Sequence, residues 1–219
     1  MYVGLTAASA AAIIVLLLNL SCHVIPTRAT LPHQVNPCDS GEFHEDGGCS
    51  DCPAGFFMSH TSHYLVRCDI CGAGRFSRVA ASTCIDCPQG YFTNQNRQGE
   101  CVACALGYYQ PNAKKYTCKA CDTGKHTDQT AQPQCKNCAV GTYLNEMGQS
   151  TCKVCAVGKM QDEEGQSLCK DCLLMEFASA QGQSSCASCS AGQYQNEIGQ
   201  TGCKLYPSGG STGWATDTD

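Results

Sequence analysis

Residues 30–219 contain few of the residues from which a hydrophobic core is built. Leu, Ile, Val and Phe account for 24 of these 190 positions, and the whole chain has one Trp. A chain with so little apolar surface cannot bury enough of it to offset the conformational entropy lost on ordering. The composition therefore excludes a globular domain with one large core, and covalent or metal cross-links must supply the missing stability.

The chain also lacks long runs of charge of one sign. Its formal net charge is -5, from 14 Lys and Arg and 19 Asp and Glu. A mildly acidic chain without a basic patch is not typical of proteins that bind nucleic acids or anionic membranes. We therefore expect no nucleic-acid partner.

One long apolar run is present, at residues 5–20. Small residues at Thr27 and Ala29 form an A-x-A-like cleavage site, so residues 1–29 are predicted to be a secretory signal peptide. The first four residues lack the usual Lys or Arg. An uncleaved signal anchor is the alternative, although the run is barely long enough to span a bilayer. Both alternatives predict a secreted or extracellular protein. Contact with a membrane would come only through such an anchor or through a missing C-terminal part.

Cysteine is abundant where the apolar residues are scarce. Residues 30–219 hold 20 cysteines, and from Cys84 to Cys203 the first cysteine of each C-x-x-C pair recurs every 17 residues. A short fixed period indicates a repeat array in which each unit contacts its neighbours. We expect a leader at residues 30–37, tandem cysteine-rich repeats at 38–203, and a degenerate final repeat with a disordered tail at 204–219.

Each unit contains two cysteines separated by two residues, a glycine three residues after the second cysteine, an aromatic residue two positions later, and a closing cysteine. The glycines are Gly41, Gly55, Gly74, Gly90, Gly107, Gly124, Gly141, Gly158 and Gly192. The aromatic residues are Phe43, Phe57, Phe76, Phe92, Tyr109, Tyr143, Phe177 and Tyr194. A second glycine precedes the closing cysteine in later units, at Gly148, Gly165, Gly182 and Gly199.

These positions predict local structure. A glycine at a fixed place in a tight loop indicates positive φ, and the second glycine predicts a second turn. The aromatic side chain is expected to cover the nearby disulfide. No segment after residue 22 has a sustained helical period. The predicted fold is small, disulfide-rich and mostly irregular, with short β-strands, and forms an elongated rod of tandem modules of about 17 residues.

Parity favours one arrangement of the disulfides. If the second cysteine of each pair bonds the first cysteine of the next pair, all 20 cysteines are used. If pairs interlock first to first and second to second, two cysteines are left over, which a secreted scaffold seldom tolerates. Spacing alone does not decide between the two. The cysteines predicted to form structural disulfides are Cys38, Cys49, Cys52, Cys68, Cys71, Cys84, Cys87, Cys101, Cys104, Cys118, Cys121, Cys135, Cys138, Cys152, Cys155, Cys169, Cys172, Cys186, Cys189 and Cys203.

The nine C-x-x-C pairs have the spacing found in some metal and redox sites. Paired C-x-x-C motifs can build a zinc site, but nine pairs cannot be grouped in twos. A thiol–disulfide enzyme needs one reactive pair on a packed fold rather than nine equivalent ones. The histidines His44, His60 and His63 are interpreted as solvated loop residues. We expect no cofactor, no metal and no catalytic residue.

The pattern C-x-x-C-x-x-G-x-[YF], with Gly-Gln-Ser before a closing cysteine, resembles the ephrin-receptor-like cysteine-rich repeat. That repeat is related to growth-factor-receptor and tumour-necrosis-factor-receptor cysteine-rich modules. The sequence departs from it at Met175 in the glycine position, and at His126 and Met160 in the aromatic position. The resemblance implies an extracellular module that binds other proteins. Such arrays also occur in surface coats and matrix proteins, so a structural role is the alternative.

Two features of the array are candidates for recognition. Leu173, Leu174 and Met175 form an apolar triplet that a narrow rod can hardly bury, so they are a possible contact patch, with local packing against Phe177 as the alternative. A lysine follows the first cysteine of five units and would form a cationic row if the units stack with little rotation. These lysines are Lys119, Lys136, Lys153, Lys170 and Lys204.

Overall fold

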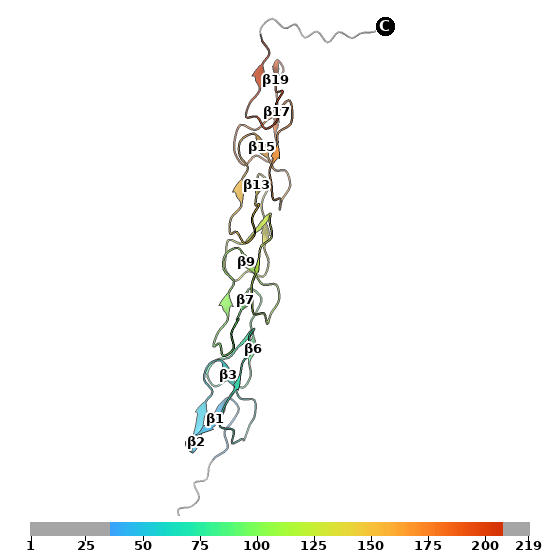
Figure 1. Cartoon of the computed structure of the whole chain (residues 1–219). Coiled ribbons are helices and arrows are strands. Elements are labelled where there is room, and N and C mark those ends of the chain that lie inside the picture. The colour runs from blue at the N-terminus through green and yellow to red at the C-terminus, as the bar shows by residue number, and fades with distance from the viewer. Residues whose placement is uncertain (1–35, 208–219) are drawn as a thin grey trace, which may run out of the picture. The chain divides into compact units, whose positions relative to one another are not determined.

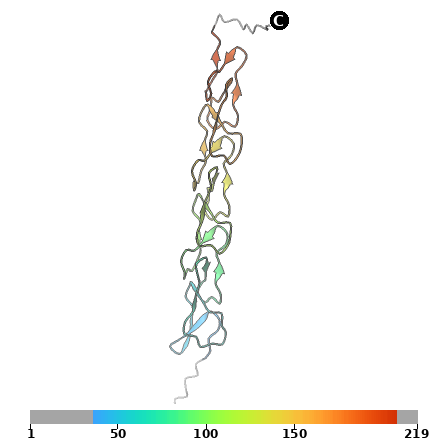
Figure 2. The same ribbon diagram turned by 45° about the vertical axis from the view of Figure 1, so that its right-hand side comes forward.

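The computed structural model describes residues 36–207, so the predicted signal peptide and almost all of the leader and tail lie outside the described residues. All regular structure within this range is β-strand, arranged as ten two-stranded antiparallel hairpins. The hairpins follow one another in chain order along an elongated array (Figures 1 and 2). This confirms the expected fold class. No helix in residues 36–207 has the length and apolar character needed to cross a membrane.

The hairpins pair each odd-numbered strand with the even-numbered strand that follows it. β1 and β2 are joined by Asp46 and Gly47, with φ of 47° and 86°, as the Asp-Gly turn of a tight hairpin requires. The strands are β1 (Glu42–Glu45), β2 (Gly48–Asp51), β3 (Phe56–Phe57), β4 (Asp69–Ile70), β5 (Arg75–Phe76), β6 (Ile85–Asp86), β7 (Tyr91–Phe92), β8 (Val102–Ala103), β9 (Tyr108–Tyr109), β10 (Lys119–Ala120), β11 (Lys125–His126), β12 (Lys136–Asn137), β13 (Thr142–Tyr143), β14 (Lys153–Val154), β15 (Lys159–Met160), β16 (Lys170–Asp171), β17 (Glu176–Phe177), β18 (Ala187–Ser188), β19 (Gln193–Tyr194) and β20 (Lys204–Leu205).

Each hairpin is closed by one disulfide, and a unit is named here by its two bonded cysteines. In unit 121–135 the disulfide joins Cys121 to Cys135 with their Cα atoms 5.8 Å apart. β11, which follows Cys121, pairs with β12, which follows Cys135, and the N–H of Cys138 then donates to the carbonyl oxygen of Gly124 at 2.8 Å. Because the disulfide fixes the loop, a two-residue strand pair is enough to define the hairpin.

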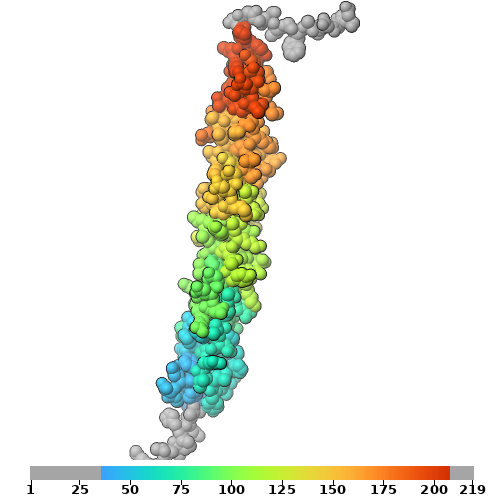
Figure 3. All heavy atoms as spheres, viewed as in Figure 1, coloured from blue at the N-terminus to red at the C-terminus, as the bar shows by residue number. Residues whose placement is uncertain are grey.

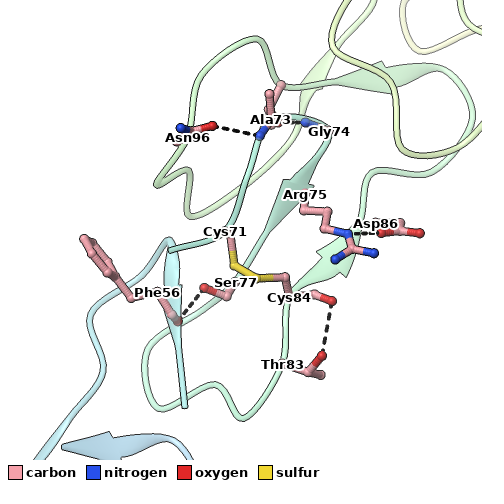
Figure 4. The surroundings of a disulfide bond; sticks show 11 residues. Phe56, Cys71, Ala73, Gly74, Arg75, Ser77, Thr83, Cys84, Asp86 and Asn96 are labelled. Atoms are coloured by element: carbon pink, nitrogen blue, oxygen red, sulfur yellow. Dashed lines mark hydrogen bonds and ion pairs between the residues drawn. A yellow bond between two sulfur atoms is a disulfide. The ribbon is translucent and has the colours of Figure 1, made fainter. Parts of the chain in front are cut away.

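The ten disulfides have the sequential arrangement that uses every cysteine from Cys38 to Cys203. The first three loops differ in length, with sequence separations of 11, 16 and 13, whereas each later loop has a separation of 14. Figure 4 shows one of the shorter loops, closed by Cys71 and Cys84, with Arg75 Nε donating to Asp86 Oδ1 at 2.7 Å across the hairpin. The pairs are 38–49, 52–68, 71–84, 87–101, 104–118, 121–135, 138–152, 155–169, 172–186 and 189–203.

The recurring glycines adopt the predicted left-handed backbone. All nine have φ between 76° and 89°. The second-turn glycines have φ of 71° to 73°, which confirms the second turn. Earlier units place a residue with a side chain in that same turn, at φ of 58° to 63°, which the sequence did not reveal. These residues are Ala80, Arg97, Lys114 and Ala131.

Backbone hydrogen bonds join each unit to the next. The N–H of Gly124 donates to the carbonyl of Leu144 at 2.7 Å, and the N–H of Gly148 donates back to the carbonyl of Cys121 at 2.8 Å. The unit after that is also in contact, because a Cβ on Gly124 would overlap the carbonyl oxygen of Gly165. Each unit of this kind therefore touches the next two along the chain. The space-filling view shows the result as one narrow column of atoms (Figure 3).

The core is a narrow column inside the array. It contains Cys38, the second cysteine of each C-x-x-C pair from Cys52 to Cys172, and the residue after the aromatic position in the units from 52–68 onward. Several of the latter are polar, and their side chains brace the loop. Gln161 Nε2 donates to the carbonyl of Leu168 at 2.6 Å, and Gln161 Oε1 accepts from the N–H of Glu163 at 3.1 Å. Ser77 Oγ donates to the carbonyl of Phe56 at 2.7 Å (Figure 4). The buried residues of this second set are Met58, Ser77, Thr93, Gln110, Thr127, Leu144, Gln161, Ala178 and Gln195.

The last described unit ends on a tyrosine instead of a cysteine. The N–H of Tyr206 donates to the carbonyl of Gly192 at 3.3 Å, the bond that a cysteine N–H makes in the other units. The ring of Tyr206 lies 4.8 Å from that of Tyr194, centroid to centroid. Aromatic packing thus holds this hairpin end, and the repeat frame continues to Tyr206 without the cysteine.

Candidate functional site

The triplet Leu173, Leu174 and Met175 is exposed on unit 172–186. The three side chains have exposed fractions of 66%, 56% and 45%, while Phe177 is half-buried. The triplet therefore stays open to solvent rather than being buried against Phe177. We call Leu173–Met175 the apolar patch. Three adjacent exposed apolar side chains on a narrow array are a candidate contact surface.

Hydrogen bonds hold the backbone of the apolar patch in place. The N–H of Glu176 donates to the carbonyl of Leu173 at 3.2 Å, and the N–H of Leu173 donates to Glu176 Oε2 at 3.3 Å. On the neighbouring unit, the carbonyl of Gln195 accepts from the N–H of Met175 at 2.8 Å. The carbonyl of Met175 accepts from the N–H of Cys189 at 2.8 Å. The patch is thus presented by a turn fixed on both sides.

Met175 occupies the place of the recurring glycine and takes its conformation, with φ of 65°. A left-handed backbone costs a residue with a Cβ roughly 1–2 kcal/mol. In the regular units before it, a Cβ at this position would overlap a carbonyl oxygen two units along, as Gly158 would overlap Gly199. Met175 therefore destabilises its turn relative to glycine. Its side chain is exposed at a position where the other units have a glycine and no side chain.

The predicted cationic row consists largely of ion pairs. Four of its five lysines lie beside a carboxylate of the same hairpin, so most of the positive charge of the row is paired. The pairs are Lys136 with Asp128 at 2.9 Å, Lys153 with Glu146 at 3.0 Å, Lys170 with Asp162 at 2.7 Å, and Lys204 with Glu197 at 3.5 Å. Exposed pairs of this kind contribute little to stability, and they weaken the case for an acidic partner.

Two of these pairs shift the pKa values of their groups. The hydrogen bond from Lys170 lowers the pKa of Asp162 from its ordinary 3.8, and a backbone hydrogen bond acts in the same direction. The same bond raises the pKa of Lys170 from its ordinary 10.5. The hydrogen bond from Lys136 lowers the pKa of Asp128. The charged forms of these groups are thus stabilised at neutral pH.

At two aromatic positions the residue lines a surface hollow together with a cysteine of the following unit. Tyr109 lines a surface hollow together with Cys135, and Tyr143 lines another with Cys169. The offset is the same in both cases. In the unit between those of Tyr109 and Tyr143, His126 holds the aromatic position, and its Nδ1 lies 3.2 Å from Cys152 Sγ. The departure of His126 from the aromatic pattern was visible in the sequence, but its contact with Cys152 depends on the stacking of units.

The other histidines among residues 36–207 lie in the first two units. Leu65 N–H donates to His63 Nδ1 at 3.1 Å, and the ring of His60 lies 6.3 Å from that of His63. His63 is nine-tenths buried, and its Nε2 and that of His44 are buried without a hydrogen-bond partner among residues 36–207. The interpretation of all three as solvated loop residues is therefore wrong for His63, and also for His44, which lies in β1 with its Nε2 buried.

Two groups of described side chains have the spacing of a metal site. His126, Cys138 and Cys152 form one, and Cys38, Glu42 and Cys49 form the other. In each group the two cysteines are bonded to one another. Sulfurs in a disulfide are not thiolates, and the thiolate is the form that binds metal. The oxidised chain therefore does not offer these cysteines as metal ligands.

Comparison with known families places two segments of the array. A family described as tyrosine-protein kinase ephrin type A/B receptor-like matches residues 74–106 and 176–216, together about a third of the chain. No curated protein matches the chain. The matched segments are ephrin-receptor-like cysteine-rich repeats, and the ten tandem disulfides fit a cysteine-rich repeat array. Receptor-like repeats and extensive disulfide bonding both indicate an extracellular location.

Proposed function

We propose that the protein is an extracellular binding module, similar to a receptor ectodomain, which presents the apolar patch to an extracellular protein. The observation that carries the proposal is the exposure of Leu173, Leu174 and Met175 on a turn held by hydrogen bonds from both sides. Apolar side chains on a rigid support lose little conformational freedom on binding. The proposal includes no catalytic step, because the work is done by a surface.

The neighbouring units support the choice of this patch. The positions that correspond to Leu174 in earlier units carry Val140 and Val157, which are exposed by 44% and 42%, and Leu106, exposed by 47%. Only in unit 172–186 do large apolar side chains occupy this position, the one before it and the glycine position after it. The patch is therefore a local enrichment on a surface that is otherwise mixed.

A structural role as a spacer or coat component is the second candidate. It is favoured by the way regular units contact the next two along the chain, as Gly124 does with Leu144 and Gly165. Such contacts stiffen an array and fix the distance between its ends. In that case the repeats would act collectively, and no single unit would carry the function.

One experiment separates the two candidates. The oxidised protein, immobilised through its C-terminus, is incubated with extracellular material, cross-linked and analysed by mass spectrometry. The test variant is Leu173→Ser with Leu174→Ser, and the matched control is Val140→Ser at the equivalent position two units earlier. A discrete partner that the double variant loses and Val140→Ser retains supports the binding module. Self-association without a discrete partner, unchanged in both variants, supports the spacer and overturns the proposal.

A further inference from the structure

Among the described disulfides, Cys138–Cys152 is the one with an imidazole nitrogen at hydrogen-bond distance from a sulfur atom. His126 Nδ1 lies 3.2 Å from Cys152 Sγ. In the flanking units the same place is taken by the phenol of Tyr109 or Tyr143, beside Cys135 or Cys169. A phenol has an ordinary pKa near 10 and does not accept a proton from a thiol at neutral pH, whereas an imidazole does.

The charged groups around His126 are already paired with one another. On its own hairpin, Lys136 lies opposite His126 and is bound to Asp128, whose pKa also responds to His126. On the next unit, Lys153 follows Cys152 and is bound to Glu146. Asp122 and Lys125 line the hollow beside Tyr109, but the corresponding positions in the next unit are the uncharged Ala139 and Thr142. The contact between imidazole and sulfur is therefore not dominated by a neighbouring net charge.

We propose that Cys138–Cys152 is a thiol–disulfide exchange site, reduced by an external dithiol ahead of the other disulfides of the array. A dithiol transfers two electrons and two protons to the disulfide and is itself oxidised to a disulfide. The bond between the two sulfurs breaks, Cys138 Sγ takes one proton, and His126 takes the other. The product is a neutral Cys138 thiol and a Cys152 thiolate paired with the His126 imidazolium.

The ion pair between the Cys152 thiolate and the His126 imidazolium is the reason why this disulfide is reduced before the others. A disulfide is more easily reduced when its reduced form is stabilised, and an imidazolium beside a thiol lowers the pKa of that thiol. Cys138 is fully buried and Cys152 is half-buried, so Cys152 is the thiol that reduction presents to solvent. The site would then accept thiol-reactive partners or a mixed disulfide at Cys152. This goes beyond the binding role and does not depend on the apolar patch.

Graded reduction tests the order of opening. The full oxidised chain is treated with increasing dithiothreitol without denaturant, quenched with iodoacetamide and mapped by mass spectrometry. Cys152 is expected to be alkylated before any other cysteine, with Cys138 as the buried thiol released by the same reduction. At pH 6 an ordinary thiol with pKa about 8.5 is roughly 0.3% thiolate, whereas a thiol with pKa about 6 is roughly half thiolate. The low-pKa thiolate is also a weaker nucleophile, which lowers its rate of alkylation about tenfold and offsets part of the advantage of its larger thiolate fraction. Cys152 in the partly reduced chain should therefore react about tenfold faster at pH 6 than an ordinary thiol.

Two variants assign the effect to the histidine. His126→Tyr gives this unit the ring found in its neighbours and is expected to remove both the early reduction and the reactivity at pH 6. Tyr143→His places an imidazole beside Cys169 and is expected to bring Cys155–Cys169 among the early disulfides. Uniform reduction of the native chain, or an unchanged order in His126→Tyr, would overturn the proposal. If His126→Tyr does not fold, Tyr143→His decides alone, and failure to advance Cys155–Cys169 overturns it.

Discussion

A methyl group placed on Gly158 would overlap the carbonyl oxygen of Gly199, although Gly199 lies two units further along the chain. The same relationship joins Gly107 to Gly148 and Gly141 to Gly182. Two separate constraints therefore favour glycine at this recurring position. Its φ is positive, and the backbone of the second unit along occupies the space where a Cβ would be.

Replacement of Gly158 by Ala should destabilise the array more than replacement of Gly192. Both have positive φ, 77° and 83°, but within the described residues nothing lies within 4 Å of a Cβ on Gly192. Gly192→Ala should cost about 1–2 kcal/mol for the left-handed backbone alone. Gly158→Ala should add about 1–3 kcal/mol of overpacking to that. Denaturant unfolding with the disulfides intact measures both, and equal losses would show that the contact across two units does not form.

Met175→Gly separates the stability of the apolar patch from its binding. Glycine relieves the left-handed backbone at φ of 65°, so the free energy of unfolding should stay the same or rise by up to about 1 kcal/mol. Binding of the proposed extracellular partner should weaken, because one of the three patch side chains is removed. Unfolding and binding measurements on the same preparation check both. A loss of stability above about 1 kcal/mol would show that the Met175 side chain contributes to packing.

The ion pair between Lys170 and Asp162 should be visible in a titration of the carboxyl group. The pKa of Asp162 is expected below 3.8 in the folded chain and should return toward 3.8 in Lys170→Met. Lys153→Met, which breaks a different pair, is the matched control and should leave Asp162 unchanged. Because the folded pKa is lowered, the contribution to stability is present above pH 3.8 and is lost as pH falls through the folded value. An identical Asp162 titration in Lys170→Met would contradict the pairing.

Removal of one disulfide should weaken the array substantially. Cys121→Ala with Cys135→Ala opens a loop of about 15 residues, and the chain-entropy estimate for such a loop is about 3 kcal/mol. Full reduction should unfold the array, because its buried column is too narrow to hold the fold alone. Circular dichroism and limited proteolysis follow both changes. Order that persists in reductant and is lost with a strong chelator would show that metal, not sulfur, holds the chain.

The sequence predicts the unit well and the contacts between units poorly. The period of 17 residues and the recurring glycines specify a closed loop with a left-handed turn, and the structure has both. The left-handed backbone of Lys114 and Ala131 was not predicted, because these residues have no intrinsic preference for it. The preceding unit imposes it: the N–H of Ala131 donates to the carbonyl of Cys104 at 2.9 Å.

For the candidate sites, too, features within one unit can be predicted from the sequence and contacts between units cannot. Exposure of Leu173 follows from the narrowness of the array, which composition alone indicates. The contact of His126 with Cys152 and the burial of Gln161 depend on how far each unit is rotated and shifted against the next. A repeat period gives the number of residues per unit and says nothing about that rotation. The signal that was available for Gln161 is its constant place in the repeat, directly after the position that is aromatic in most units.

The pairing of cysteines within each unit is the central claim, and trypsin tests it without reductant. Cleavage after Lys136 and Lys153 cuts between the two cysteines of successive C-x-x-C pairs and releases residues 137–153, which contain Cys138 and Cys152 and no other basic cleavage site. The structure predicts a single free peptide, lighter by two hydrogens than its reduced form because its own cysteines are bonded. Recovery of residues 137–153 only as part of a larger disulfide-linked species, with Cys152 bonded to Cys135, would contradict the account.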